Sequence, residues 1–186
     1  VKSLSRTASE NNSVTDSAAG ATALACGVKT NNGCVGVFPD DVNADKSYPM
    51  NLCEFAKSNG MAAGIVTTDS TRGATPGGFS AHTSSRSNTS EITKFQLQSN
   101  FDLIWGVKTS TCSRSKAESA GFEYVTDYTE MEALAEGSRS FGQFSGDLWK
   151  SDCGNMPTLT QMTTKAIDLL DSNEKGFFLM VEGAHI

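Results

Sequence analysis

The chain has 186 residues, with 15 Lys and Arg against 21 Asp and Glu, and its formal net charge is −6. This length suits one globular domain. An acidic balance without a long Lys/Arg cluster argues against a surface that binds nucleic acids or anionic membranes. The longest apolar run, Phe177–Val181, is far shorter than the roughly 20 residues that span a bilayer.

Two helices are expected in the first part of the chain. Ser17–Val28 is rich in Ala and predicts a helix, for which Asp16 or Ser17 suits the N-cap position. A long loop rich in Asn, Gly and Asp follows. A second helical pattern, over Leu52–Ala56, ends at Asn59-Gly60, which is typical of a helix C-cap.

Short apolar runs in the rest of the chain predict strands. These runs are Met61–Thr67, Phe101–Val107, Phe122–Thr126 and Phe177–Val181. Between them, a helix is expected to begin at Thr75-Pro76 and to end near Arg86, and two more are expected at Met131–Ala135 and Leu159–Leu170. Strands that alternate with helices, and are apolar on both faces, predict a three-layer α/β/α sandwich around a mainly parallel sheet. We expect this sandwich to be incomplete.

Several polar residues lie where ligands gather in such folds, at the carboxyl ends of the strands. Ser17 begins a helix, where backbone N–H groups favour an anion, and Glu182 directly follows a buried strand. Thr75 and Arg86 bracket the helix that follows another strand. Each also has a purely structural interpretation. Asp16 and Ser17 are suited to cap a helix, and Thr75 is suited to an N-cap position. Glu182 could simply be the first solvent-exposed residue after a strand. Arg86 could be a cation that stabilises a helix C-terminus.

Longer strings of residues resemble a known family. The strings are Val14–Thr22, Ala25–Thr30, Gly64–Thr68, Ala74–Pro76, Ala81-His82 with Arg86, and Gly176–Gly183. The first closely resembles the nucleophile signature of alkaline phosphatases, and the others follow in that family's order. The resemblance implies that residues 1–186 are part of an alkaline-phosphatase-like catalytic domain, without its first strand and without the half that carries most zinc ligands.

The resemblance also implies a chemistry and a set of site residues. Members of this family hydrolyse phosphate monoesters through a phosphoserine, at a site of two zinc ions and one magnesium ion, and release inorganic phosphate. Ser17 corresponds to the nucleophile and a zinc ligand, and Arg86 to the residue that binds the substrate phosphate. Asp16 would orient Arg86 by an ion pair. Thr75 and Glu182 correspond to magnesium ligands.

The sequence departs from the family pattern in two ways. Gly73 stands where the family usually has Asp or His, a side chain that supports the magnesium site, and Asp69 or Asp16 could compensate. Most zinc ligands of the family would lie outside this chain, and neither His82 nor His185 matches one. His82 is expected to pack or cap, and His185 has no partner that spacing reveals. We therefore expect this stretch alone to be inactive.

Two alternative functions stay open. One is a phosphate-binding remnant without zinc chemistry. The other is a related sulfatase or phosphodiesterase, which the unmodified Ser17 and its spacing to Arg86 disfavour. The family resemblance further implies an extracytoplasmic location and a homodimer of the full-length protein. Cys112 and Cys153 are the first candidates for a disulfide, and Asn11 and Asn88 begin possible glycosylation sequons.

Overall fold

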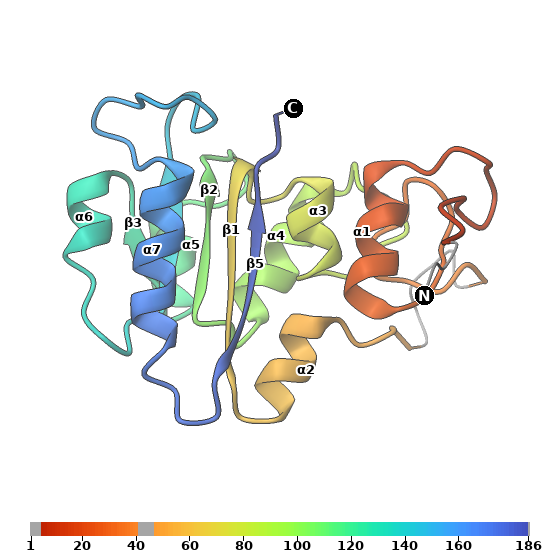
Figure 1. Ribbon diagram of the computed structural model, residues 1–186, viewed down its shortest axis with the longest axis horizontal. Coiled ribbons are helices and arrows are strands. Elements are labelled where there is room, and N and C mark those ends of the chain that lie inside the picture. The colour runs from red at the N-terminus through yellow and green to blue at the C-terminus, as the bar shows by residue number, and fades with distance from the viewer. Residues whose placement is uncertain (1–4, 41–46, 186) are drawn as a thin grey trace.

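The computed structural model describes residues 5–40 and 47–185, which build a five-stranded sheet with helices on both faces (Figure 1). The strands are β1 (Ala62–Ser70), β2 (Leu103–Val107), β3 (Glu123–Val125), β4 (Ser140–Phe144) and β5 (Phe177–Glu182). They are ordered β3-β4-β2-β1-β5, and every neighbouring pair is parallel. The predicted α/β sandwich around a parallel sheet is confirmed.

The helices divide between the two faces of the sheet. They are α1 (Ser17–Cys26), α2 (Leu52–Ser58), α3 (Ala74–Gly78), α4 (Thr89–Gln98), α5 (Arg114–Ser119), α6 (Tyr128–Glu132) and α7 (Leu159–Leu170). Residues of α1, α2, α4 and α5, with Phe79 at the end of α3, share one hydrophobic cluster with the sheet, and residues of α6 and α7 share the other. Among the described residues, none of these helices has the length and apolar character to span a bilayer.

Strand β1 shows why the strands of this sheet have continuous apolar sequences. Ala63 and Ile65 belong to the cluster beneath α1 to α5, whereas Ala62 and Val66 belong to the cluster beneath α7. Successive side chains of a strand point to opposite faces, so a strand covered on both faces has no polar side. The parallel order of the strands also brings their carboxyl ends to one edge of the sheet. The start of α1 lies at the same edge (Figure 1).

Helix α3 differs from the prediction. It begins at Ala74, with Gly73 rather than Thr75 in the N-cap position, and it ends at Gly78 instead of near Arg86. Its last residue packs directly against Ala21 of α1, and the chain then leaves the helix. Arg86 therefore lies in a loop. Helices α4 and α5 and strand β4 are further elements that the sequence patterns did not predict.

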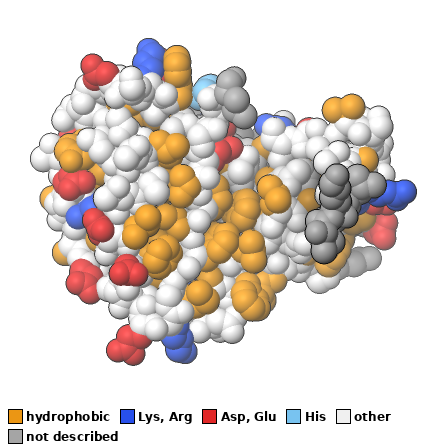
Figure 2. Space-filling view, viewed as in Figure 1, with side chains coloured by type: hydrophobic (Ala, Val, Ile, Leu, Met, Phe, Trp, Pro, Cys, Tyr) orange, Lys and Arg blue, Asp and Glu red, His pale blue; other side chains and the backbone are white. Residues whose placement is uncertain are grey.

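Strand β5 is an edge strand of the described sheet, because β1 is its one neighbour there. Most of its apolar side chains are only partly covered, and Val181 is 43% exposed. Figure 2 shows hydrophobic side chains gathered over this part of the molecule. Exposed residues of the neighbouring helices, Ile167 of α7 and Phe55 of α2, add to them. The sheet thus ends on an apolar surface.

The contact between α1 and α3 gives a test of the packing. A Cβ atom at Gly78 would lie 2.7 Å from Ala21 Cβ and 3.1 Å from its carbonyl carbon, so Gly78→Ala is expected to lower the free energy of unfolding by about 1–3 kcal/mol. Gly20→Ala on α1 is the matched control, because nothing lies within 4 Å of its added Cβ. That control should be neutral or stabilising by up to ~1 kcal/mol. Urea unfolding measures both, and equal midpoints for the two variants would contradict the packing.

Candidate functional site

The Asp16 carboxylate joins three segments of the chain. Its Oδ1 atom accepts a hydrogen bond from the Ala19 backbone N–H at 2.9 Å and so caps helix α1. Its Oδ2 atom accepts from the Gly33 backbone N–H at 3.0 Å and lies 3.3 Å from Arg86 Nη1. The backbone N–H of Asp16 donates to Asn32 Oδ1 at 3.0 Å. Asp16 is therefore the hub between α1, the loop around Gly33 and the loop that carries Arg86.

This environment keeps Asp16 ionised. Burial raises the pKa of the carboxyl group, but the hydrogen bonds from Ala19 and Gly33 and the charge of Arg86 together outweigh burial. The pKa consequently lies below its ordinary value of 3.8. The ion pair that the resemblance implied is present in the structure, and its role in catalysis stays a prediction.

The loop that carries Arg86 is held by its backbone. The Arg86 N–H donates to the Gly33 carbonyl oxygen at 2.7 Å, and Val35 and Thr83 form an antiparallel bridge through two N–H···O=C bonds of 2.9 and 2.8 Å. Gly33 thus fixes both Asp16 and Arg86, through its N–H and its carbonyl group. The Arg86 side chain is 42% exposed, so its guanidinium keeps donors for an anion.

Ser17 and Thr75 lie at the junction of α1 and α3. Ala18 and Ala74, their chain neighbours, form one small buried cluster with Val35. Ser17 is exposed and Thr75 is half-buried. In the part of the chain that the structure describes, neither side-chain hydroxyl has a hydrogen-bond partner. Both hydroxyls are therefore available to a ligand.

Glu182 is tied to the end of β1. It pairs with Thr67 in the sheet register, and Thr67 Oγ1 donates to Glu182 Oε2 at 2.5 Å. The same hydroxyl accepts from the Asp69 N–H at 2.9 Å. One residue further along β1, Thr68 Oγ1 accepts from the Ala184 N–H at 2.9 Å. Glu182 is thus held in place by specific bonds. Thr67 is not predicted from the sequence, because a buried Thr in a strand has no distinguishing pattern.

The donor atoms decide which metals these residues suit. Thr75 and Glu182 offer a hydroxyl and a carboxylate, the oxygen ligands that Mg²⁺ prefers, often with water in its remaining positions. Structural and catalytic zinc sites need three or four protein ligands. Over residues 5–40 and 47–185, no group of three or more His, Cys, Asp and Glu side chains is close enough to hold a metal. The donor atoms of Thr75 and Glu182 are thus of the kind that magnesium prefers, and the described residues do not by themselves supply the ligands of a zinc pair.

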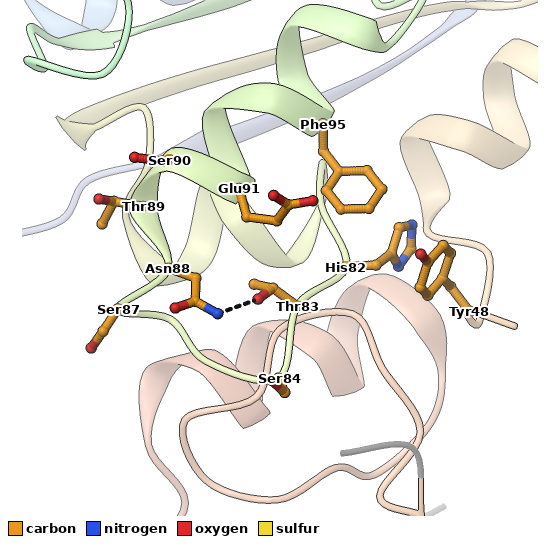
Figure 3. A pocket seen from close by; sticks show the side chains of 10 residues that line it. All are labelled: Tyr48, His82, Thr83, Ser84, Ser87, Asn88, Thr89, Ser90, Glu91 and Phe95. Atoms are coloured by element: carbon orange, nitrogen blue, oxygen red, sulfur yellow. Dashed lines mark hydrogen bonds between the residues drawn. The ribbon is translucent and has the colours of Figure 1, made fainter. Parts of the chain in front are cut away.

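A pocket of about 640 Å³ opens beside the Arg86 loop (Figure 3). On its wall, His82 lies 2.5 Å from the Gly36 carbonyl oxygen through Nδ1 and 2.8 Å from Glu54 Oε1 through Nε2. The ring of Tyr48 stacks on His82 with centroids 4.3 Å apart. The expected packing role of His82 is confirmed. None of the predicted site residues lines this pocket, which lies beside the site.

Asn88 also lines this pocket, and its Nδ2 donates to Thr83 Oγ1 at 3.1 Å. Glycosylation at Asn11 and Asn88 stays a prediction.

The expected disulfide between Cys112 and Cys153 is wrong in this structure, because both thiols are free. Cys112 is buried in the cluster beneath α1 to α5, where burial raises the pKa of its thiol to about 11. Cys153 lies on the loop before α7, close to Met156, which packs on the opposite cluster. The two residues are therefore associated with opposite faces of the sheet.

Comparisons with known proteins agree on one family. The sequence profile described as alkaline phosphatase matches residues 1–104 and 106–186. Alkaline phosphatase 4 of Bacillus subtilis (strain 168) is 37% identical over 188 residues, a match that covers 93% of this chain and 40% of that protein. The structure of the cold-active alkaline phosphatase of the psychrophile Shewanella sp. superposes on this chain with a TM-score of 0.79 at 33% identity. The match covers 92% of this chain and 43% of the Shewanella chain.

A second similar structure contains a metal. It is a variant of the TAB5 alkaline phosphatase with Mg bound in its M3 site, with a TM-score of 0.76 and 29% identity. The match covers 96% of this chain and 53% of that chain. The present chain thus spans between 40% and 53% of the length of these three proteins.

The Asp16 hub predicts an acid-dependent stability. At pH 7, Asp16→Asn is expected to lower the free energy of unfolding by about 1–3 kcal/mol, because it removes hydrogen bonds to a charged acceptor. Since the folded-state pKa lies below the ordinary 3.8, this contribution is full above pH 3.8 and disappears as the pH falls through the folded-state value. Urea unfolding at several pH values measures it. Asp168→Asn is the control, because Asp168 is exposed and has no partner among the described residues. A difference between Asp16→Asn and wild type that is independent of pH would refute this account.

Proposed function

Since the chain belongs to the alkaline phosphatase family, we propose that the protein hydrolyses phosphate monoesters through a phosphoserine at Ser17 and releases inorganic phosphate. The observation that carries the proposal is the Asp16 hub. Its carboxylate caps the helix that begins with Ser17 and also forms an ion pair with the guanidinium of Arg86. A nucleophile and an anion-binding group in fixed relation are what phosphoryl transfer requires.

The proposed roles follow from the chemistry of each side chain. Arg86 binds two oxygens of the substrate phosphate with its planar fork, while Asp16 keeps that fork oriented. The Ser17 oxygen forms a bond to phosphorus as the bond between phosphorus and the alcohol oxygen breaks. Water then cleaves the phosphoserine and releases phosphate. The exposure of Ser17 leaves its hydroxyl open to such a substrate.

The cofactors are part of the proposal. We expect the complete protein to use two zinc ions and one magnesium ion, as the family resemblance implies, and a TAB5 relative is described with Mg bound. Thr75 and Glu182 would hold magnesium, and Ser17 would contact zinc. When bound, such ions stabilise the negative charge that develops on oxygen. The remaining zinc ligands would come from outside the described residues.

The family resemblance also supports two proposals about the complete protein. We propose that it is a homodimer and that it is located outside the cytoplasm. The abundance of Ser and Thr, 23 and 19 residues, is compatible with a secreted protein.

Ser17→Ala tests the nucleophile. In the complete protein, this variant is expected to lose phosphate-monoester turnover by on the order of 10³-fold or more and to form no phosphoenzyme, because it lacks the hydroxyl proposed to attack phosphorus. Turnover and acid-trapped phosphoenzyme are the measurements. Ser119→Ala, on an exposed position of α5, is the control. Normal turnover by Ser17→Ala would show that Ser17 is not the nucleophile. Phosphate binding without turnover in the wild-type protein would favour a phosphate-binding remnant.

Arg86→Lys tests the phosphate-binding role. Lys keeps the charge but lacks the fork, so the inhibition constant for inorganic phosphate is expected to rise by about 10- to 100-fold. Arg114→Lys on α5 is the control, since Arg114 pairs with Glu118 and Glu130 on the surface. Unchanged phosphate inhibition in Arg86→Lys would show that Arg86 does not bind the phosphate.

A further inference from the structure

The loop between β1 and α3 brings Asp69 against Gly73. A Cβ atom on residue 73 would lie 2.4 Å from Asp69 Oδ2 and 3.2 Å from its carboxyl carbon. Real Cβ atoms essentially never come this close to another atom, so the Asp69 carboxylate fills the space where a side chain at position 73 would begin. Only glycine at position 73 leaves room for this arrangement.

Neighbouring elements hold this loop in place. The Gly73 N–H donates to the Ser70 carbonyl oxygen at 2.7 Å and closes a turn. Thr71 is bound on both sides: its carbonyl oxygen accepts from Gln96 Nε2 at 2.6 Å, and its Oγ1 accepts from Gln143 Nε2 at 3.0 Å. Both Gln side chains are fully buried. The position of the Asp69 backbone is therefore set by the core and does not depend on solvent-exposed contacts.

Asp69 is also connected to the other oxygen donors of this edge. The Thr67 hydroxyl donates to the Glu182 carboxylate and accepts from the Asp69 backbone N–H, so one hydroxyl links the Glu182 side chain to the Asp69 backbone. Gly73, which the Asp69 carboxylate contacts, precedes Thr75 by two residues. Among the described residues, the half-buried Asp69 carboxylate has no hydrogen-bond or ion-pair partner of its own.

We propose that Asp69 supports the magnesium site in place of the Asp or His that the family usually has at position 73. The Asp69 carboxylate reaches the place where a side chain at position 73 would begin, from four residues earlier in the chain. This inference rests on the proposed function, which supplies the magnesium ion. A hard cation with few carboxylate ligands keeps several bound waters, and a neighbouring carboxylate orients them.

The test moves the carboxylate from position 69 to position 73 and measures magnesium binding directly. Isothermal titration calorimetry with MgCl₂ on the complete protein, dialysed free of loosely bound Mg²⁺, gives the dissociation constant. Asp69→Asn keeps the shape of the side chain, and it is expected to raise this constant by about 10- to 100-fold. Gly73→Asp alone is expected to raise it as well, because the new Cβ displaces Asp69 Oδ2. The double variant Asp69→Ala/Gly73→Asp returns a carboxylate to this place without the clash.

The outcomes separate the inference from the proposed function. Weak binding in Asp69→Asn, together with a constant within about threefold of wild type in the double variant, supports the inference, because a merely structural role of Asp69 would not be rescued from position 73. Asp69→Asn with a constant within about twofold of wild type overturns it, provided that the wild-type protein binds Mg²⁺ and hydrolyses phosphate monoesters. A wild-type protein that does neither overturns the proposed function itself. Asp168→Asn is the charge-matched control.

Discussion

The hydrogen bonds of the Asp16 carboxylate connect the parts of the molecule on which the site depends. One oxygen caps α1, and the other accepts from Gly33 and faces Arg86. The Gly33 carbonyl oxygen in turn accepts a hydrogen bond from the Arg86 backbone N–H. The three segments are far apart in sequence and none belongs to the sheet. A single half-buried ionised group therefore joins these segments at this edge of the molecule, and its cost of desolvation is offset by backbone donors.

The second part of the site depends on the sheet itself. The register of β1 and β5 places Thr67 beside Glu182, and the Thr67 hydroxyl extends that register into the loop at Asp69. Helix α1 then packs on α3 through Gly78 and Ala21, so the two halves of the site are joined by a close contact between small residues. Both halves of the candidate site are thus fixed by contacts within the fold.

How far the sequence predicts this arrangement depends on what each element buries. The strands β1, β2, β3 and β5 are predicted from their apolar runs, whose residues contribute to the clusters on both faces of the sheet. Strand β4 was missed, because its buried residues include Ser140, which accepts from the Trp105 indole N–H, and Gln143, which binds Thr71. Helix α3 was predicted too long, because Thr75-Pro76 signals a start and no local pattern reveals that Gly78 must pack against α1. Buried polar bonds between distant segments carry no local signal.

The same distinction applies to the site. Asp16, Ser17 and Arg86 were found through strings that resemble a family, and the structure shows the contact between Asp16 and Arg86. Gly33 was not found, because it acts through its backbone groups, which every residue has. Asp69 was named only as one of two residues that could compensate for Gly73. The distance between Asp69 and the vacant Cβ position distinguishes it, and no sequence pattern contains that distance.

The open edge of β5 bears on how this chain behaves in solution. An edge strand presents unpaired N–H and C=O groups, and a strand of another molecule can add to them. Here the edge is flanked by exposed apolar side chains such as Val181 and Ile167, and the protective devices of natural edges, a Lys or Pro within the strand, are missing from Phe177–Glu182. When the chain is concentrated or refolded by itself, we expect this strand to favour association between molecules. A charged residue introduced at Val181 would be the first change to make for solubility.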